Sequence, residues 1–251
     1  MIKKLHYVWL GGKPLPAAVQ DSIKSWRKYC PDWEIIQWNE NNFPISDFRW
    51  TREAVARRKY AFAADFIRLW ALKTYGGGYC DTDVTFVHPI ENSIKSKFVC
   101  GIENHLIGTD DLKFLSLQGI DKRTGSPMAG FGMQTGFLYS EPEHQFVKHC
   151  IKTIYEGGQR AFIKDGNEDL IVIDGALIWA LKDFGFVFKD ETQCLEPNII
   201  IYNSSVYATR KTKNNGTYLI HWFDQSWKEN NNITFLLKKI IKKYFYFFFR
   251  K

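Results

Sequence analysis

Two aspartates stand two residues apart in the segment YGGGYCDTDVTF, residues 75–86. In a β-strand, alternate side chains point to the same face, so Asp81, Asp83 and Tyr79 would share one side of a strand. Two carboxylates held this close repel each other unless a cation or hydrogen-bond donors compensate their charge. Mg²⁺ and Mn²⁺ take oxygen ligands and often bridge a carboxylate to substrate phosphates. The D-x-D spacing therefore indicates either a divalent-metal site or a strand end with solvated aspartates.

The segment just before it, FAADFIRLWALKTYGG, carries another acid and a base. Asp65 and Arg68 have the i, i+3 spacing at which helical side chains meet. Their neighbours are apolar nearly all round, which predicts a buried helix. Because buried charges need partners, these side chains form either an ordinary ion pair or a site for sugar and ribose hydroxyls.

The elements that must position these residues indicate one α/β domain. Apolar runs predict strands at residues 5–10 and 33–38, and the helical spacing of Val19, Ile23 and Trp26 predicts a helix between them. A strand, a helix and a second strand within so few residues are typical of a Rossmann-like unit.

A helix in one or two pieces is predicted over residues 51–75, and the three glycines at 76–78 would stop it. A strand is predicted directly after them, over residues 79–87. No G-x-G-x-x-G or G-x-x-x-x-G-K-[ST] motif is present, so a bound nucleotide would have to be held through a metal. Further strands are predicted at residues 98–103 and 133–140 and in EPNIIIYN and TYLIHW, and further helices in EHQFVKHCIKTIYEGG and at residues 175–185.

Charge and cysteine usage narrow the class of protein. The net charge is +7, but the stretch KKIIKKYFYFFFRK at residues 238–251 holds six basic residues and no acidic one. The rest is nearly balanced, so no nucleic-acid partner is predicted. Five scattered cysteines without a C-x-x-C pair argue against a disulfide scaffold or structural zinc and favour a reducing cytoplasm. No segment has the length and apolarity of a signal peptide or a transmembrane helix.

Three segments, in order along the chain, resemble glycosyltransferase family 32, the sugar-binding-region transferases with a D-x-D motif. That family includes bacterial capsule and lipopolysaccharide transferases and the yeast initiating mannosyltransferase, and the sequence is also similar to the catalytic domain of the clostridial glucosylating toxins. The resemblance implies the α/β nucleotide-sugar transferase fold called GT-A over residues 1–235, with one Rossmann-like domain and a mostly parallel central sheet flanked by helices. The three segments are IKKLHYVWLGGKPLP with SWRKYCPDWEIIQWNENNF, then AFAADFIRLWALKTYGGGYCDTDV, then IHWFDQSW.

The resemblance also implies roles for the residues already singled out. Asp83 would ligate Mn²⁺ or Mg²⁺ directly, and Asp81 would contact the ribose, or the metal through water. Asp65 and Arg68 match positions that contact the donor sugar and the ribose. Tyr79 matches a position near the nucleotide.

Further matches lie at the two ends of the chain. Val8 and Trp9, where the first strand ends, match the segment that holds and stacks the base. His221, Ser226 and Trp227 match a C-terminal motif that closes over the diphosphate. There Ser226 or His221 would complete the coordination sphere of the metal, and Trp227 would donate a hydrogen bond to the phosphate of the departing nucleotide.

The sequence departs from the family pattern at three places. IHWFDQSW has one histidine where the family has two, so His221 is either a metal ligand or a core histidine. Gln134 and Thr135 stand where the family has an asparagine, which makes them candidates for the position near the anomeric carbon. Asp174 is either an acid on the acceptor side or a helix N-cap.

The function implied by the resemblance is that of a metal-dependent, retaining hexosyltransferase. Its donor would be UDP-galactose, UDP-glucose or a UDP-N-acetylhexosamine, and its acceptor a lipid-linked oligosaccharide in bacterial capsule or surface-polysaccharide synthesis. We favour a front-face reaction, in which the donor phosphate deprotonates the incoming hydroxyl; a double displacement would need a carboxylate under the sugar, for which Asp174 is the candidate. Two alternatives stay open: a toxin-like protein glycosyltransferase, and a non-catalytic peripheral membrane protein that keeps the fold.

The C-terminal tail, residues 236–251, combines lysines with a run of aromatic residues. Contiguous exposed aromatics are a hazard in a soluble protein, whereas aromatic and basic residues together suit an anionic membrane surface. The composition of the tail therefore predicts a cytoplasmic enzyme that is bound peripherally to the inner face of the membrane. A helix docked on the body and a dimer contact are the alternatives.

Overall fold

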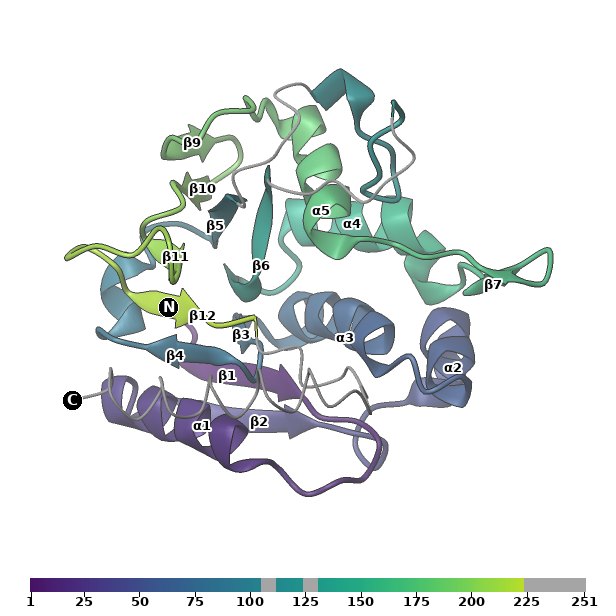
Figure 1. The fold of residues 1–251 in the computed structure, drawn as a ribbon, viewed down its shortest axis with the longest axis horizontal. Helices are drawn as coiled ribbons and strands as arrows, with labels where there is room; N and C mark the ends of the chain where they lie inside the picture. The colour runs from purple at the N-terminus through teal and green to yellow at the C-terminus, as the bar shows by residue number, and fades with distance from the viewer. Residues whose placement is uncertain (105–111, 124–130, 224–251) are drawn as a thin grey trace, which may run out of the picture.

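The computed structural model describes residues 1–104, 112–123 and 131–223 (Figure 1). Its centre is a seven-stranded sheet. Strand β1 pairs in parallel with β2 and β3, and β10 pairs in parallel with β5, whereas β6 runs antiparallel to β3 and β5, and β9 antiparallel to β10. Five strands thus share one direction and two oppose it, which confirms the predicted mostly parallel sheet. In spatial order the strands are β2 (Glu34–Trp38), β1 (Lys4–Val8), β3 (Gly77–Cys80), β6 (Phe131–Ser140), β5 (Phe98–Asn104), β10 (Ile199–Tyr202) and β9 (Gln193–Leu195).

The predicted opening unit of strand, helix and strand is confirmed. Helix α1 (Ala17–Tyr29) connects the parallel strands β1 and β2, and Pro16 stands at its N-cap. Trp26 of α1 is fully buried, and its indole N–H donates to the carbonyl of Val84, 2.9 Å away. This bond ties α1 to the chain just after the D-x-D motif.

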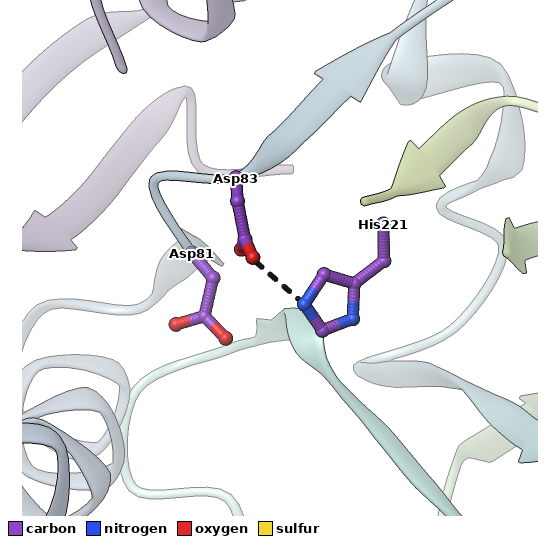
Figure 2. A group of neighbouring side chains, drawn as sticks. All are labelled: Asp81, Asp83 and His221. Carbon is purple, nitrogen blue, oxygen red and sulfur yellow. Dashed lines mark ion pairs between the residues drawn. The ribbon is translucent and has the colours of Figure 1, made fainter. Parts of the chain in front are cut away.

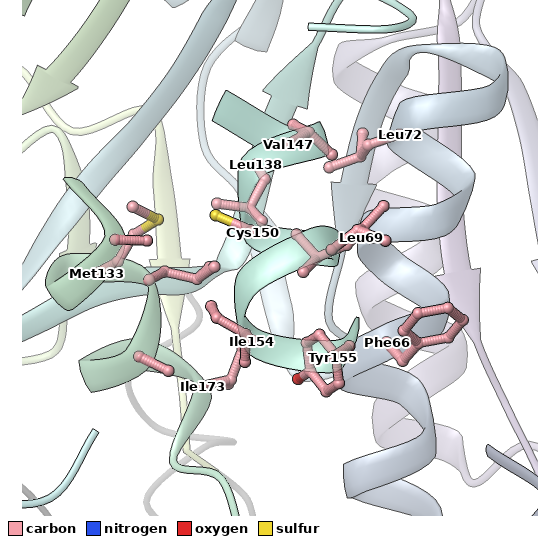
Figure 3. Packing of buried hydrophobic residues seen from close by; sticks show 14 of the residues in the cluster. Phe66, Leu69, Leu72, Met133, Leu138, Val147, Cys150, Ile154, Tyr155 and Ile173 are labelled. Atoms are coloured by element: carbon pink, nitrogen blue, oxygen red, sulfur yellow. The ribbon is translucent and has the colours of Figure 1, made fainter. Parts of the chain in front are cut away.

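The opposite face of the sheet is covered by helices and holds the larger apolar core. The helix predicted over residues 51–75 forms in two pieces, α2 (Arg49–Ala56) and α3 (Tyr60–Tyr75). Helix α4 (Gln145–Tyr155) packs against α3, and α5 (Ile173–Leu181) packs against α4 and β6. Figure 3 shows Phe66 and Leu69 of α3 facing Tyr155 and Val147 of α4. Because this part of α3 is enclosed, Asp65 and Arg68 on it are buried as well.

The three glycines at 76–78 do stop α3, as predicted. Gly76 and Gly77 have φ angles of +64° and +97°, a region that favours glycine. A Cβ on Gly77 would lie 2.5 Å from the carbonyl oxygen of Lys4. These glycines therefore end the helix and also let β3 approach β1 closely.

The prediction of one strand over residues 79–87 is wrong. The chain leaves β3 after Cys80, turns through residues 81–83, and then forms β4 (Val84–Phe86) in a different sheet. The amide of Val84 donates to the carbonyl of Asp81 across this turn, at 3.1 Å. The second sheet has the order β11-β12-β4, with β11 (Tyr207–Thr209) and β12 (Leu219–His221). The two aspartates thus lie at the junction of two sheets rather than along one strand.

The remaining described elements are short. The hairpin β7 (Ile163–Lys164) and β8 (Asn167–Glu168) projects beside α2, as Figure 1 shows. No helix in the described ranges has the length and apolarity needed to cross a membrane. The predicted tail, residues 236–251, lies outside the described residues. Single 3₁₀ turns occur at η1 (Ile45–Asp47), η2 (Ile90–Ser93), η3 (Leu112–Phe114), η4 (Glu156–Gly158) and η5 (Lys182–Phe184).

Candidate functional site

Three potential metal ligands meet at the junction of the two sheets (Figure 2). One ligand atom from each of Asp81, Asp83 and His221 lies within 4.8 Å of the others. His221 ends β12, where antiparallel pairing places it opposite Val84, and its Nε2 lies 3.3 Å from Oδ1 of Asp83. Two carboxylates and one imidazole offer the oxygen and nitrogen donors that Mn²⁺ accepts, and the carboxylates alone suit Mg²⁺. This donor set fits a divalent metal.

Backbone contacts hold the turn and β12 together. The carbonyl of Asp83 accepts a hydrogen bond from the amide of Trp222 at 3.0 Å. The indole of Trp222 in turn donates to the hydroxyl of Thr85 at 2.8 Å. These two bonds, one on each side of His221 and Asp83, explain how ligands more than a hundred residues apart in sequence are kept side by side.

Asp81 is oriented through one of its two carboxylate oxygens. Its Oδ1 accepts from the hydroxyl of Tyr79 at 2.8 Å and lies 3.4 Å from Nη2 of Arg68. Both contacts use the same oxygen, so among the described residues Oδ2 is the oxygen that remains for a ligand. Tyr79 itself is buried beneath the guanidinium of Arg68, which lies 4.7 Å above its ring.

Arg68 connects helix α3 to the strands that form the site. Its guanidinium donates to Oδ1 of Asp65 and to the carbonyl of Thr135, both at 2.6 Å. It thereby joins α3 to β6 and, through Asp81, to the end of β3. The side chain is buried, so these contacts are made away from bulk water, where ion pairing is strong.

Within the described part of the chain, acidic side chains outnumber basic ones in this site. Burial raises the pKa of Asp65 to about 7 although Arg68 opposes the shift, and the nearby charges of Asp81 and Asp174 raise it further. Arg68 is thus shared among several acids and cannot neutralise them all. An excess of buried and partly buried carboxylates among the described residues favours the binding of a cation.

The pKa of His221 is set by two opposing effects. Burial alone would lower it, but the carboxylates of Asp83 and Glu103 outweigh burial and raise the pKa well above the ordinary value. The two carboxylates therefore favour the protonated imidazole, and a metal ligand at this position would have to compete with that proton.

The sequence did not single out Glu103, although the structure places it in the site. It lies near the end of β5 and is 4% exposed, and its Oε2 is 3.5 Å from Nδ1 of His221. The one signal in the sequence is an acidic residue at the last position of a predicted apolar strand. That signal becomes informative only when the position of β12 is known.

The residues expected to hold the base lie where the first strand ends. Val8 is buried in the core, whereas Trp9 is partly exposed, and the Trp9 indole donates to the carbonyl of Lys13 at 2.6 Å. Strands β1 and β3 are parallel neighbours, so Trp9 and Asp81 follow strands that end at the same edge of the sheet.

Asp174 does not cap a helix. The N-cap of α5 is Val172, and Asp174 follows in the first turn, so the N-cap alternative is wrong. Asp174 faces Gly132 of β6, where an added Cβ would lie 3.0 Å from its own Cβ. Its effect on the pKa of Asp65 places its charge near the site, in keeping with the alternative of an acid on the acceptor side.

Gln134 is fully buried in β6. Its Oε1 accepts from the amide of Phe137 at 2.9 Å, and its Nε2 has no hydrogen-bond partner among the residues that the structure describes. Thr135 is also buried and reaches the site through its carbonyl, which accepts from Arg68. Ser226 and Trp227 lie outside the described residues.

The match to a known family agrees with this geometry. Residues 16–99 match the family described as "Glycosyltransferase sugar-binding region containing DXD motif". The matched segment holds Asp65, Arg68, Asp81 and Asp83. This match, which covers about a third of the chain, supports a glycosyltransferase. The resemblance predicted from the sequence is thus confirmed, and so is the prediction of an enzyme.

Two of the solved structures that the chain resembles are described as glycosyltransferases. One is described as "PaToxG Glycosyltransferase". It is 15% identical to this chain, the match covers 72% of this chain and 69% of that chain, and the TM-score is 0.46. Another is the galactosyltransferase LgtC "in complex with donor and acceptor sugar analogs". It is 12% identical to this chain, the match covers 92% of this chain and 91% of that chain, and the TM-score is 0.46. No curated protein matches the chain. The structural similarities are too distant to assign a donor or an acceptor to this glycosyltransferase.

Proposed function

We propose that this glycosyltransferase is a Mn²⁺- or Mg²⁺-dependent, retaining enzyme that transfers a hexose from a UDP-sugar to a hydroxyl of a lipid-linked saccharide. The observation that carries the proposal is the cluster of Asp81, Asp83 and His221 in a buried, acid-rich site. A bound divalent cation would neutralise the charge that develops on a diphosphate leaving group. This step needs no glycine-rich phosphate loop, and the sequence contains none.

The residues of the chain divide into ligands and supports. Asp83 and His221 reach the site from the turn and from β12, and Asp81 offers its Oδ2 while Tyr79 and Arg68 hold its Oδ1. Each ligand is therefore fixed before the donor binds, which keeps the cost of reorganisation low.

The donor fits along the edge where β1 and β3 end. Trp9 is partly exposed there and offers a ring on which a uracil base can stack, with Val8 behind it in the core. Asp65 and Arg68 lie on the inner side of Asp81, where they are placed to bind hydroxyls of the ribose and the sugar. Ser226 and Trp227 would close over the diphosphate, as the family pattern implies.

The reaction that we propose is a front-face transfer with retention of configuration. Gln134 or Thr135 would lie nearest the anomeric carbon, and Asp174 would act on the acceptor side. The resemblance to family 32 supports retention and UDP as the nucleotide. The product anomer, read from its proton coupling constant in NMR, tests retention. Trapping a glycosyl group on Asp174 would contradict the front-face route and support a double displacement.

The experiment that tests the function is a screen for nucleotide release from UDP- and GDP-sugars, with Mn²⁺ and with EDTA. We expect release of UDP from one of the hexose donors, dependent on metal and lost in Asp83→Asn. A protein that merely keeps the fold would release no nucleotide and would tolerate the substitution.

The acceptor and the location of the enzyme form a separate part of the proposal. The basic and aromatic residues of the tail support a peripheral position on the inner face of the cell membrane, where lipid-linked oligosaccharides of capsule synthesis are made. Flotation with anionic liposomes, with and without residues 236–251, tests this part. Equal recovery of the two forms would contradict it, and transfer to a protein instead of a glycolipid would favour a toxin-like activity.

A further inference from the structure

We infer that Glu103 is a positioning residue that holds the imidazole of His221 in the orientation needed to ligate the metal. The inference rests on the proposed metal site and adds a residue to it. Glu103 is not part of the D-x-D motif, and its carboxylate lies beside the ring of His221. Its proposed role is exerted through that ring.

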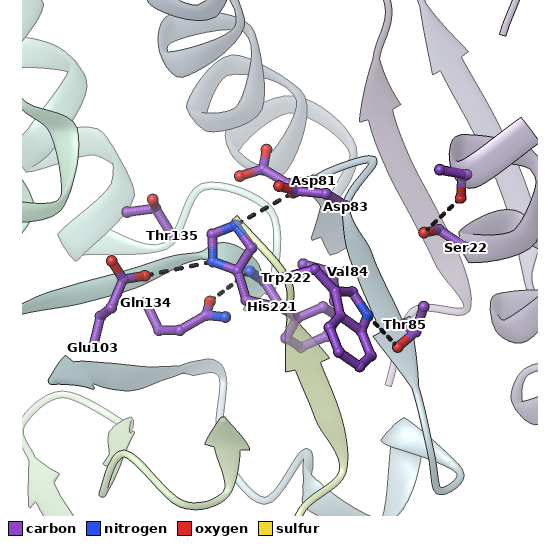
Figure 4. A network of polar contacts seen from close by, with 12 residues as sticks. Ser22, Asp81, Asp83, Val84, Thr85, Glu103, Gln134, Thr135, His221 and Trp222 are labelled. Carbon is purple, nitrogen blue, oxygen red and sulfur yellow. Dashed lines mark hydrogen bonds and ion pairs between the residues drawn. The ribbon is translucent and has the colours of Figure 1, made fainter. Parts of the chain in front are cut away.

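The two nitrogens of His221 face two different carboxylates. Nε2 lies 3.3 Å from Oδ1 of Asp83, and Nδ1 lies 3.5 Å from Oε2 of Glu103. Figure 4 shows the ring between the two acids, with one dashed line to each. Only Nε2 therefore faces the aspartate turn, and Glu103 stands behind the ring with respect to the candidate metal ligands.

This arrangement determines which nitrogen can bind a metal. A neutral imidazole carries its proton on one nitrogen and ligates through the other, and the hydrogen-bond partner of the protonated nitrogen fixes the choice. A carboxylate beside Nδ1 stabilises Nδ1–H and leaves the lone pair on Nε2, directed toward Asp83. A carboxylate in this outer position also raises the basicity of the ligating nitrogen.

The surroundings of the ring prevent it from turning away. A Cβ added to Gly136 would lie 3.0 Å from Nδ1 of His221 and 3.2 Å from Cε1, so β6 passes directly against the ring. The ring of Phe223 lies close by as well, with 3.9 Å between ring centroids. A ring enclosed in this way keeps the orientation that Glu103 and Asp83 favour.

A purely structural role for Glu103 makes a different prediction. A buried carboxylate that only pairs with a histidine contributes little to stability, because its desolvation cost offsets the attraction. In that case, removing Glu103 would change the stability of the protein but not its affinity for metal. Metal affinity and the protonation of the His221 ring therefore distinguish a positioning role from a structural one.

Two variants of Glu103 separate its charge from its hydrogen-bond acceptor. Glu103→Gln keeps a carbonyl oxygen beside Nδ1, where Glu103 has its carboxylate at 3.5 Å, whereas Glu103→Leu removes it at similar volume. We expect Glu103→Leu to bind Mn²⁺ roughly 10- to 100-fold more weakly than the unchanged enzyme, the range seen on losing the outer partner of a metal-bound histidine. Glu103→Gln is expected to restore most of that loss. The measurement is Mn²⁺ titration of the full chain with UDP present, followed by the electron paramagnetic resonance of free Mn²⁺.

The matched control is Asp169→Asn, which removes a partly buried carboxylate charge outside the site, where Asp169 binds Arg160. It should lower the melting temperature and leave Mn²⁺ affinity unchanged. Equal Mn²⁺ affinity of Glu103→Leu and the unchanged enzyme would overturn the inference about Glu103 and leave the metal site intact. Failure of the unchanged enzyme to bind Mn²⁺ would overturn both.

A second measurement decides the matter if Glu103→Leu does not fold. The ¹⁵N shifts of the His221 ring in the unchanged enzyme, with UDP and Mg²⁺, report which nitrogen is protonated. We expect a proton on Nδ1 and none on Nε2. A proton on Nε2, with Nδ1 unprotonated beside Glu103, would contradict the inference.

Discussion

The molecule contains two buried clusters of charged side chains, and they differ in their balance of charge. In one, beside the β7–β8 hairpin, Arg160 binds Oδ2 of Asp169 through Nε and Nη2 at 3.0 and 2.5 Å, one cation with one anion. In the other, at the junction of the two sheets, one arginine and one histidine face five acids among the residues that the structure describes. These acids are Asp65, Asp81, Asp83, Glu103 and Asp174.

The difference indicates which cluster serves structure and which serves function. A balanced pair satisfies itself and fixes the chain around it, here by tying the segment after α4 to the hairpin. An unbalanced cluster costs stability until a cation binds, and a protein retains such a cluster where the cation is needed. Changes in the first cluster should therefore alter stability, and changes in the second should alter activity.

The largest expected effect is that of Asp83→Asn on catalysis. The substitution removes one charged ligand from the candidate metal site, so metal-dependent UDP release should fall by at least about 100-fold, as when a key electrostatic group is lost from an active site. The melting temperature in EDTA should change little, because the cluster keeps an excess of acid. If Asp83→Asn were inactive only because it unfolds, the contrast between the clusters would fail.

The reverse pattern is expected for Arg160→Met in the balanced cluster. Removal of Arg160 leaves the carboxylate of Asp169 largely buried without its cation, which should cost about 3 kcal/mol of unfolding free energy. Metal-dependent UDP release at a temperature below the new transition should remain near that of the unchanged enzyme. Chemical denaturation measures the first quantity, and a large loss of release in folded protein would contradict the assignment.

Asp65 links the charge imbalance to pH. Its carboxyl binds protons more tightly in the folded state, where its pKa is about 7, than in the unfolded state, where the ordinary value is 3.8. The folded state therefore holds the extra proton between these pH values, and the contribution of Asp65 to stability falls as the pH rises from about 4 through about 7.

Asp65→Asn should remove this part of the pH dependence while keeping an oxygen that accepts from Arg68. Melting temperatures in EDTA should fall less steeply with rising pH for the variant than for the unchanged protein, and the variant should gain relative stability at pH 8. If the melting temperatures of the two proteins changed with pH in parallel, the excess of acids would have no effect on the pKa of Asp65.

The smallest effect is expected at the surface, where charge balance matters little. Lys3 pairs with Asp32 and Glu91, and all three side chains are well exposed to solvent. Because solvent and salt screen such pairs, Lys3→Gln should leave the melting temperature and UDP release essentially unchanged. A loss of stability comparable to that of Arg160→Met would mean that burial does not determine how much a charged pair contributes to stability.

The sequence predicted those parts of the fold and site that depend on local patterns. The opening strand–helix–strand unit follows from apolar runs and helical spacing, and the glycine stop follows from residue type. The pairing of Asp65 with Arg68 follows from their i, i+3 spacing on α3, and the structure confirms it.

The parts that depend on distant pairing could not be predicted from local patterns. The D-x-D motif looked like one strand because nothing local shows that β4 leaves the central sheet to pair with β12. The same pairing brings His221 beside Asp83 and Glu103, so the role of Glu103 was invisible until β12 was placed. Asp174 resembled an N-cap because the start of α5 was placed two residues late.

The central claim is that the unbalanced cluster binds the catalytic metal. X-ray diffraction at the manganese absorption edge, from crystals grown with UDP and Mn²⁺, tests it most directly. We predict one strong anomalous peak within coordination distance of Asp83 and of Nε2 of His221. A peak elsewhere in the molecule, or UDP bound without any peak at this site, would contradict the account.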